Sequence, residues 1–240
     1  MIEQITIVIP AYNEFERIPA TLAEIRSFIE CVPGLIKEVI VVDDGSPDSG
    51  KTIEASMYFI NKMSLRILQL IENQGKWGAI QYGLEHATTD AILLLDADGS
   101  ASIHELAKIS KLQSTVLRKK VALFGSRFMK GAHTYDKSVL RTIVSHGYRT
   151  YVLFWYWFAT GRKNIDDMQA PFKLLYKSCI KGTLQEKRFA GDVELACILD
   201  CTIQNIPLQF VHKDGGSIKV TTMFRMAWST MVICLRNKFK

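Results

Sequence analysis

The chain has 240 residues, of which 48% are hydrophobic and 22% charged, with a formal net charge of +6. This length suits one large domain, or one domain with an appendage, that can bury a sizeable core. The sequence shows neither a signal peptide pattern nor a run approaching the about 18 to 20 apolar residues of a membrane span. Five cysteines without a Cys-x-x-Cys motif argue against a disulfide framework and favour a reducing compartment.

The first half of the chain alternates short apolar or β-branched runs with stretches of helical composition. Such alternation implies right-handed βαβ crossovers and a mostly parallel sheet with flanking helices, the α/β class. The predicted strands are Gln4–Pro10, Val39–Val42, Leu65–Ile71, Ala91–Leu95 and Val121–Phe124; the predicted helices cover residues 16–30, a segment opened by Pro47 and Asp48, the segment from Asn73–Lys76 to Glu85, and 103–117.

The second half is predicted to contain a long helix over residues 138–158. From Val152 to Phe158 this helix is apolar on every side. Such a surface is either buried or faces lipid, and its Trp and Tyr content is typical of a membrane interface. The remaining predicted elements are a strand at Phe172–Tyr176, a helix at Asp192–Leu199, a strand at Ile203–Val211 and a helix at Met223–Arg236.

Polar clusters follow the carboxyl ends of the predicted strands. Ligands of open α/β sheets bind outside these ends, so the clusters predict a single cleft. The clearest cluster is Asp96-Ala97-Asp98, whose two carboxylates share one side of the chain. They suit Mg²⁺ or Mn²⁺ carrying a diphosphate, although aspartates that merely cap the next helix have the same local sequence. The other clusters are Asp43-Asp44, Asn73–Lys76 and Arg127.

In this order and spacing, these stretches resemble the motifs of inverting family 2 glycosyltransferases with the GT-A fold. The resemblance is closer to the dolichyl-phosphate mannose synthases and dolichyl-phosphate glucosyltransferases, and it extends from Ile7 to about Val220. It implies transfer of a hexose, with inversion, from GDP-mannose or UDP-glucose to a polyprenyl or dolichyl phosphate. The matching stretches are VIPAYNE at 8–14, VVDDGS at 41–46, NQGK at 73–76, LDADG at 95–99 and GSR at 125–127, with weaker matches at 167–173, 192–195 and 216–219.

The resemblance assigns nucleotide and metal contacts residue by residue. Asp98 would hold the Mg²⁺ or Mn²⁺ that offsets the charge on the departing diphosphate. From local sequence alone, a helix cap explains Asp44 about as well as a nucleotide contact does. A solvated lysine at a helix start likewise explains Lys76 about as well as a contact near the diphosphate. The residues assigned to the nucleotide sugar are Pro10, Tyr12, Glu14, Asp44, Lys76, Asp96, Ala97 and Asp98, and those assigned to the metal are Asp98, Asp96 and Ser100.

The acceptor side is assigned in the same way. A phosphate acceptor is largely ionised at neutral pH, so it needs positioning by cations such as arginine rather than a strong base. The alternative acceptor is a sugar hydroxyl of a polysaccharide or glycolipid, which needs a carboxylate base, Asp192 or Asp167. Asp192 also fits a helix N-cap. The candidate acceptor-phosphate ligands are Arg127, Arg141, Lys213 and Lys219, and the candidate catalytic residues are Asp98, Arg127 and Asp192.

Four positions depart from the pattern of the family. Trp77 stands where a small glycine is common, and Ser100 where a longer amide often makes a second metal contact. Pro171 replaces a usual glycine, and Ile218 interrupts a Ser-Lys pair. These departures leave the shape of the acceptor loop and the sugar preference open, but not the overall chemistry.

Two other functional classes compete with a glycosyltransferase. A nucleotidyltransferase also places carboxylates and a metal at strand ends, but residues 10–14 are not its glycine-rich signature. A non-catalytic nucleotide-sugar-binding subunit is disfavoured because Asp96, Asp98 and Arg127 are all retained.

We expect a peripheral protein on the cytoplasmic face of a membrane, with no nucleic acid partner. The predicted C-terminal helix combines Phe224 and Trp228 with Arg225, Arg236 and Lys238, the amphipathic basic pattern of an interfacial helix. Burial in the core or in a dimer interface is the alternative for both aromatic stretches. The predicted domains are a transferase domain over 1–220, with a nucleotide-sugar half at 1–128 and an acceptor half at 129–220, and an amphipathic helix at 221–240.

Overall fold

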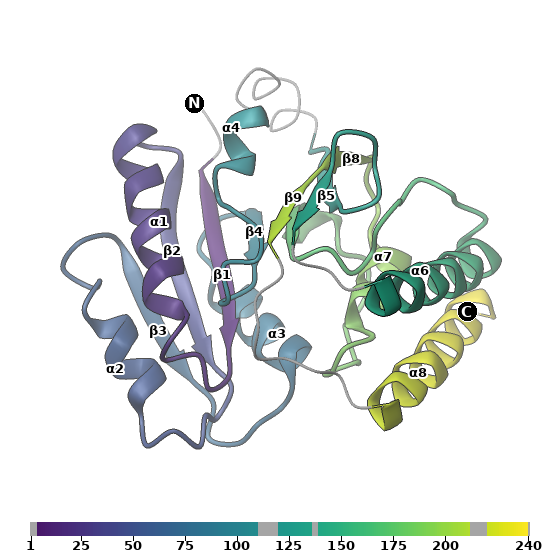
Figure 1. Ribbon diagram of the computed structural model, residues 1–240, viewed down its shortest axis with the longest axis horizontal. Helices are drawn as coiled ribbons and strands as arrows, with labels where there is room; N and C mark the ends of the chain where they lie inside the picture. Colours follow the sequence, from purple (N-terminus) through teal and green to yellow (C-terminus); the bar gives the residue numbers. More distant parts are fainter. Residues whose placement is uncertain (1–3, 110–119, 136–138, 212–219, 240) are drawn as a thin grey trace.

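The computed structural model describes residues 4–109, 120–135, 139–211 and 220–239, with the side chains of all of these except 108–109, 139–143 and 220. The strands are β1 (Ile5–Ala11), β2 (Ile36–Asp43), β3 (Leu65–Gln69), β4 (Ala91–Leu95), β5 (Ala122–Ser126), β6 (His133–Tyr135), β7 (Phe172–Tyr176), β8 (Ile203–Pro207) and β9 (Gln209–Val211). Seven of them form one sheet in the order β3-β2-β1-β4-β7-β5-β8, and β6 pairs with β9 in a second sheet (Figure 1).

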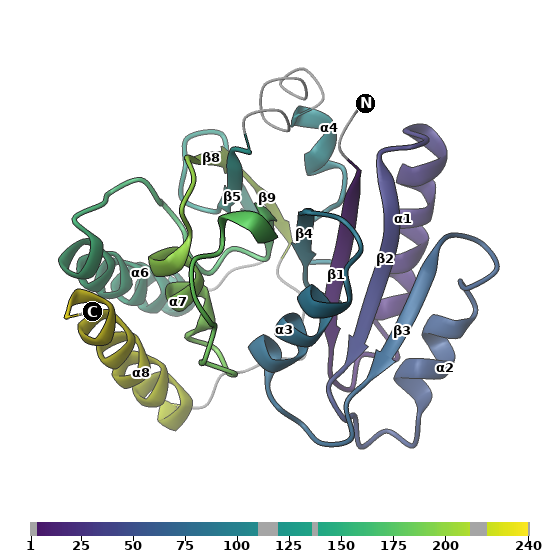
Figure 2. The same cartoon turned by 180° about the vertical axis from the view of Figure 1, so that it is seen from behind.

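Helices cover both faces of the large sheet. The two views place α1 and α2 on one face and α3 on the other (Figures 1 and 2). At the far end of the sheet, α6 and α8 pack against each other and against α7. The helices are α1 (Ile18–Cys31), α2 (Lys51–Met57), α3 (Lys76–His86), α4 (Glu105–Ile109), α6 (Val139–Thr160), α7 (Gly191–Ile198) and α8 (Val220–Lys238), with a 3-10 turn at Lys177–Cys179.

The sheet is mostly parallel, as the sequence predicts. The first four strands run in one direction, with Ala11 at the end of β1 in register with Asp43 at the end of β2. β7 is the exception, because it runs antiparallel to both β4 and β5. The carboxyl ends of β1, β2 and β4 therefore meet at one edge of the sheet.

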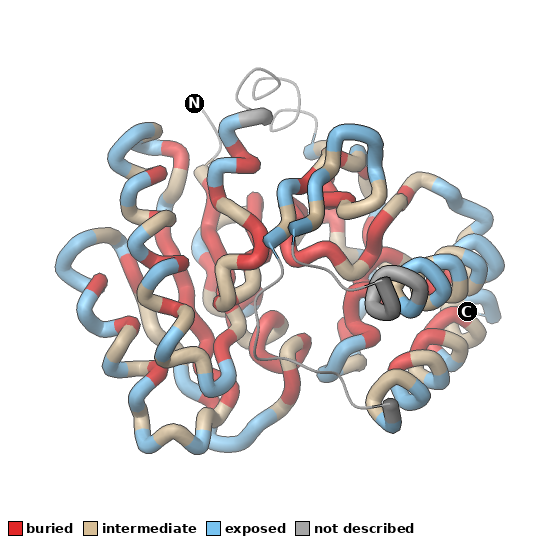
Figure 3. Tube along the Cα trace, in the orientation of Figure 1, coloured by how far each residue is buried: buried red, intermediate tan, exposed pale blue. Residues whose placement is uncertain are grey.

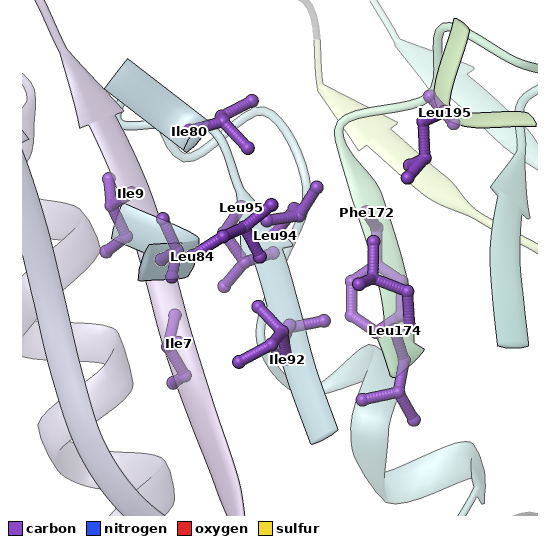
Figure 4. Packing of buried hydrophobic residues seen from close by; sticks show 14 of the residues in the cluster. Ile7, Ile9, Ile80, Leu84, Ile92, Leu94, Leu95, Phe172, Leu174 and Leu195 are labelled. Atoms are coloured by element: carbon purple, nitrogen blue, oxygen red, sulfur yellow. The ribbon is translucent and has the colours of Figure 1, made fainter. Parts of the chain in front are cut away.

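A continuous apolar core lies between the sheet and its helices. Strand β4 is buried along its whole length, as its unbroken apolar run predicts. Figure 4 shows Ile7 and Ile9 of β1, Ile92 of β4, and Ile80 and Leu84 of α3 close together in this core. Since side chains on these strands and helices pack at close range, the strand ends are held in fixed relative positions.

Two predicted elements differ from the structure. The run Ile203–Val211 forms two strands, β8 and β9, because Leu208 between them donates its N–H to Ser126 and accepts from His133, which joins the two sheets. The helix expected after Pro47 begins at Lys51, because Asp48 first accepts hydrogen bonds from the N–H groups of the following turn. The predicted segment 103–117 is described only to residue 109, where it is helical.

The aromatic part of α6 is divided between core and surface. Val152 and Tyr156 are buried, whereas Phe154, Trp157 and Phe158 are exposed. Figure 3 shows the same division along α6 and α8, with buried stretches facing the molecule and exposed ones facing away. Within the described part of the chain, no helix has both the length and the apolar character needed to cross a membrane.

Candidate active site

One cavity opens at the carboxyl ends of β1, β2 and β4. Its volume is about 670 Å³, within the range of small-molecule and cofactor sites. It brings together every residue that the sequence assigned to the nucleotide sugar; their role as ligands stays a prediction. The lining residues are Pro10, Ala11, Tyr12, Glu14, Asp44, Asn73, Gly75, Lys76, Asp96, Ala97, Asp98, Arg188, Phe189 and Thr222.

The turn after β4 is fixed by hydrogen bonds between side chains and backbone groups. Thr21 of α1 donates its hydroxyl to the carbonyl of Ala97 at 2.8 Å. Asp98 Oδ1 accepts the backbone N–H of Ser100 at 2.8 Å. Gly99 between them has a φ of 66°, in the left-handed region that favours glycine. The glycine therefore lets the chain turn back so that Asp98 borders the cavity.

Carboxylates outnumber cations at this edge of the cavity. Lys76 Nζ pairs with Asp96 Oδ1 at 2.6 Å, and Arg17 pairs with Glu14 at 2.6 Å. Burial raises the pKa of Glu14 above its ordinary value, and the nearby charges of Asp98 and Asp96 raise it further, against the opposing effect of Arg17. Burial is the main cause of this shift, and the charges of Asp98 and Asp96 add a smaller contribution, which a bound divalent cation would offset.

Asp96 and Asp98 fit a metal that is shared with a diphosphate. Among the described residues, no group of three or more His, Cys, Asp or Glu side chains could hold a metal ion by itself. Mg²⁺ sites that also bind a substrate phosphate use one or two carboxylates together with the phosphate and water. Ser100 is buried and is not among the residues that line the cavity, so its role as a metal ligand stays a prediction.

Asp44 anchors the turn that leads into α3. Its two carboxylate oxygens accept the backbone N–H groups of Gln74 at 2.7 Å and Gly75 at 2.8 Å. Burial raises the pKa of Asp44, although these two hydrogen bonds act in the opposite direction. Asp44 therefore does not cap the helix that follows it in the sequence. It links β2 to α3, and it also lines the cavity.

Asp192 is held by two side chains from other elements. Its Oδ1 pairs with Lys173 Nζ of β7 at 2.7 Å, and its Oδ2 accepts from Trp77 Nε1 of α3 at 3.2 Å. All three side chains are buried. The N-cap position of α7 is Ala190, and no side chain caps that helix. The helix-cap alternative for Asp192 is therefore wrong.

Arg127, at the end of β5, forms a bidentate ion pair with Asp167. Arg127 Nε and Nη2 lie 2.7 and 3.0 Å from the two carboxylate oxygens. Burial opposes ionisation of Asp167, but the guanidinium outweighs it and holds the pKa of Asp167 below its usual value. Because the pKa of Asp167 is lowered and both of its oxygens are paired with Arg127, it is poorly suited to act as a general base.

The remaining acceptor candidates lie outside what the structure describes. Arg141 lies on α6, but its side chain is not among those described, and Lys213 and Lys219 are outside the described residues. Their roles stay predictions.

The sequence did not predict three residues of the cavity wall. Arg188 and Phe189 precede α7, and Thr222 lies in the first turn of α8. None of them follows a strand of the parallel sheet, so the strand-end rule could not find them. The loop reaches the cavity because the carbonyl of Lys187 accepts the N–H groups of Trp77 and Gly78 at the start of α3.

A family model described as "Glycosyl transferase family 2" matches residues 6–172, more than half of the chain. The chain belongs to glycosyl transferase family 2. The family resemblance of the sequence is thereby confirmed, and the protein is a glycosyltransferase rather than a non-catalytic subunit. Among curated relatives, the dolichyl-phosphate beta-glucosyltransferase of Homo sapiens is 32% identical over 90% of this chain and 70% of its own length. That of Saccharomyces cerevisiae is 30% identical over 95% of this chain and 73% of its own length.

Two solved structures share the fold of this chain. Mannosyl-3-phosphoglycerate synthase from Rubrobacter xylanophilus matches 98% of this chain and 73% of its own, with a TM-score of 0.71 and 15% identity. Glucosyl-3-phosphoglycerate synthase from Mycobacterium tuberculosis, in complex with Mn²⁺, UDP-glucose and phosphoglyceric acid, matches 99% of this chain and 80% of its own, with a TM-score of 0.67 and 14% identity. The predicted GT-A fold is confirmed.

Proposed function

We propose that this glycosyltransferase moves glucose, with inversion, from UDP-glucose to the phosphate of dolichol or another polyprenol. The observation that carries the proposal is the single cavity in which Asp44, Lys76, Asp96 and Asp98 converge. The names of the curated relatives support dolichyl phosphate and glucose. The UDP-glucose in the mycobacterial neighbour supports this donor over GDP-mannose.

Asp98, together with Asp96, is the proposed holder of a divalent metal. When bound, Mg²⁺ or Mn²⁺ supplies Lewis-acid stabilisation of the departing diphosphate. The Mn²⁺ in the mycobacterial neighbour supports a metal of this class. Lys76, which pairs with Asp96 at 2.6 Å, places a further positive charge on the same side of the cavity.

Arg127 is the proposed ligand of the acceptor phosphate. Asp167 takes its Nε and Nη2 groups, whereas Nη1 forms no hydrogen bond within the described part of the chain. Arg127 is not among the residues that line the cavity, but the charges of Asp96 and Asp192 act on its guanidinium, so it lies within electrostatic range of both carboxylates. An ionised lipid phosphate needs no general base, which agrees with the paired state of both candidate bases.

Transfer is tested with purified protein, UDP-[¹⁴C]glucose and dolichyl phosphate in detergent. We expect a chloroform-soluble radioactive product that requires dolichyl phosphate and Mg²⁺ or Mn²⁺, and a much smaller yield from GDP-mannose. Glucose transfer to a free sugar or glycolipid hydroxyl, with none to dolichyl phosphate, would overturn the acceptor.

The exposed aromatic side chains of α6 and α8 are proposed to contact the cytoplasmic face of a membrane. Phe224 and Trp228 are 74% and 66% exposed. Lys163 lies over the ring of Trp157 at 5.3 Å, and Lys238 over Phe158 at 5.6 Å, so cations accompany the aromatic rings. Aromatic rings beside lysines suit the anionic headgroup region of a bilayer.

Co-sedimentation with vesicles tests this contact. We expect wild-type protein to pellet with vesicles containing phosphatidylserine, and a Trp157→Ser, Trp228→Ser variant to stay in the supernatant. Trp155 serves as a poor probe because it packs partly against the core. Wild-type protein that stays in the supernatant would refute the membrane contact without affecting the transfer reaction measured in detergent.

A further inference from the structure

Trp77 occupies space that a residue at position 191 would otherwise need. Its side chain is completely buried between α3 and α7. A Cβ atom added to Gly191 would lie 2.2 Å from Trp77 Cγ, so no side chain fits there while the indole is in place. Trp77 and Gly191 are therefore a matched pair, which explains how the chain accepts a tryptophan where small residues are common.

The indole also has a polar contact. Its N–H points at Asp192 Oδ2 at 3.2 Å, while Lys173 Nζ holds Asp192 Oδ1 at 2.7 Å and donates to the carbonyl of Ala170 at 2.6 Å. Among the described residues, each carboxylate oxygen thus has one hydrogen-bond donor. A carboxylate oxygen has two lone pairs, so one site on each oxygen is still available.

Asp192 lies next to the large cavity at the carboxyl ends of β1, β2 and β4. A small cavity of about 10 Å³ is lined by Trp77, Lys173 and Asp192, and it shares Lys76 and Asp96 with the wall of the large cavity. Such a space is about the size of one water molecule. The charge of Asp192 acts on both Lys76 and Arg127, so the carboxylate lies within electrostatic range of both cations.

We propose that Trp77 is a positioning residue that, with Lys173, aims Asp192 at a hydroxyl group of the transferred hexose. The inference rests on the proposed transfer from a nucleotide sugar. The indole acts through Asp192 and does not itself touch the sugar. A hydrogen bond between a fixed carboxylate and a sugar hydroxyl discriminates strongly, because its loss leaves a buried polar group unpaired.

Trp77→Phe keeps a ring in the pocket and removes only the N–H donor and part of the ring. We expect a fall of about tenfold in kcat and in affinity for UDP-glucose, with affinity for UDP changed less than twofold. Asp192→Asn is expected to lower kcat and the affinity for UDP-glucose at least as much as Trp77→Phe does. Because Trp77 acts through Asp192, the double variant is expected to match Asp192→Asn alone. The proposal would be overturned if the losses of the two single variants multiply in the double variant. Wild-type kinetics of Trp77→Phe would also overturn it.

A second replacement guards against damage to folding. Benzothienylalanine at position 77 keeps the size of the indole but replaces its N–H with sulfur, and it is expected to reproduce the Trp77→Phe kinetics with an unchanged melting temperature. Tyr156→Phe is the matched control, since it removes the hydrogen bond of a buried tyrosine to Asn164, and neither residue lines the two cavities. We expect this variant to have wild-type kinetics. The preference for UDP-glucose over UDP is measured by calorimetry without turnover. An absence of lipid glucosylation in wild type would therefore refute the proposed function, while an unchanged binding preference in both replacements would refute the role of Trp77.

Discussion

Asp98→Asn separates the proposed metal site from the fold. In the structure, Asp98 Oδ1 accepts the Ser100 N–H at 2.8 Å, and the amide oxygen of asparagine can accept the same hydrogen bond. Asp98 is partly exposed, so we expect the free energy of unfolding to change by no more than about 0.5 kcal/mol. Loss of an anionic ligand removes several kcal/mol of Lewis-acid stabilisation. A loss of about 4 kcal/mol corresponds to a fall of about 10³-fold in kcat.

The assay compares glucosyl transfer, thermal melting and binding of UDP with and without Mn²⁺. We expect Mn²⁺ to tighten UDP binding to wild type and to have little effect on Asp98→Asn. The pKa of Glu14 is expected to fall in the variant, because the charge of Asp98 contributes to its elevation. Asp90→Asn is the matched control, since that carboxylate pairs with Lys120 outside the cavity wall. Full transfer by Asp98→Asn, or by wild type in EDTA, would refute the metal assignment.

Four further outcomes are expected. Asp192→Asn should slow transfer to dolichyl phosphate by well under the about 10² to 10⁴-fold of a lost general base; a larger loss in folded protein, measured by single turnover, would favour a hydroxyl acceptor. Arg127→Gln should cost about 3 to 5 kcal/mol in urea unfolding, because it leaves Asp167 buried without its partner. Since the pKa of Asp167 is lowered on folding, its ion pair stabilises wild type above about pH 4, and this stabilisation is lost as the pH falls through the lower folded value; a stability difference between wild type and Asp167→Asn that does not shrink as the pH is lowered would contradict this. Arg236→Met should cost about 2 kcal/mol, because Arg236 of α8 pairs with the buried Glu194 of α7; melting that matches wild type would show that this contact does not anchor α8.

The donor half of the site could be predicted because its residues follow strands. A short apolar run bounded by turn residues fits a strand buried in a sheet, and the polar residues that follow parallel strands gather at one edge. This rule locates Asp44, Lys76, Asp96 and Asp98 from the sequence, and all four line the same cavity. Periodicity could not separate β8 from β9, because the break at Leu208 depends on hydrogen bonds to Ser126 and His133, which are distant in the sequence.

By itself, the sequence determined the fold class, the family and the end of the sheet where the cavity lies, because hydrophobic pattern and motif order are local properties of the chain. Only the tertiary structure decided which side chains pair with each carboxylate. Asp167 and Asp192 look alike as candidate bases in the sequence, yet Arg127 takes both oxygens of the first, while Lys173 and Trp77 hold the second. Their partners come from strands and helices far away in the chain, so the pairing, and with it the protonation chemistry, exists only once the sheet has brought those elements together.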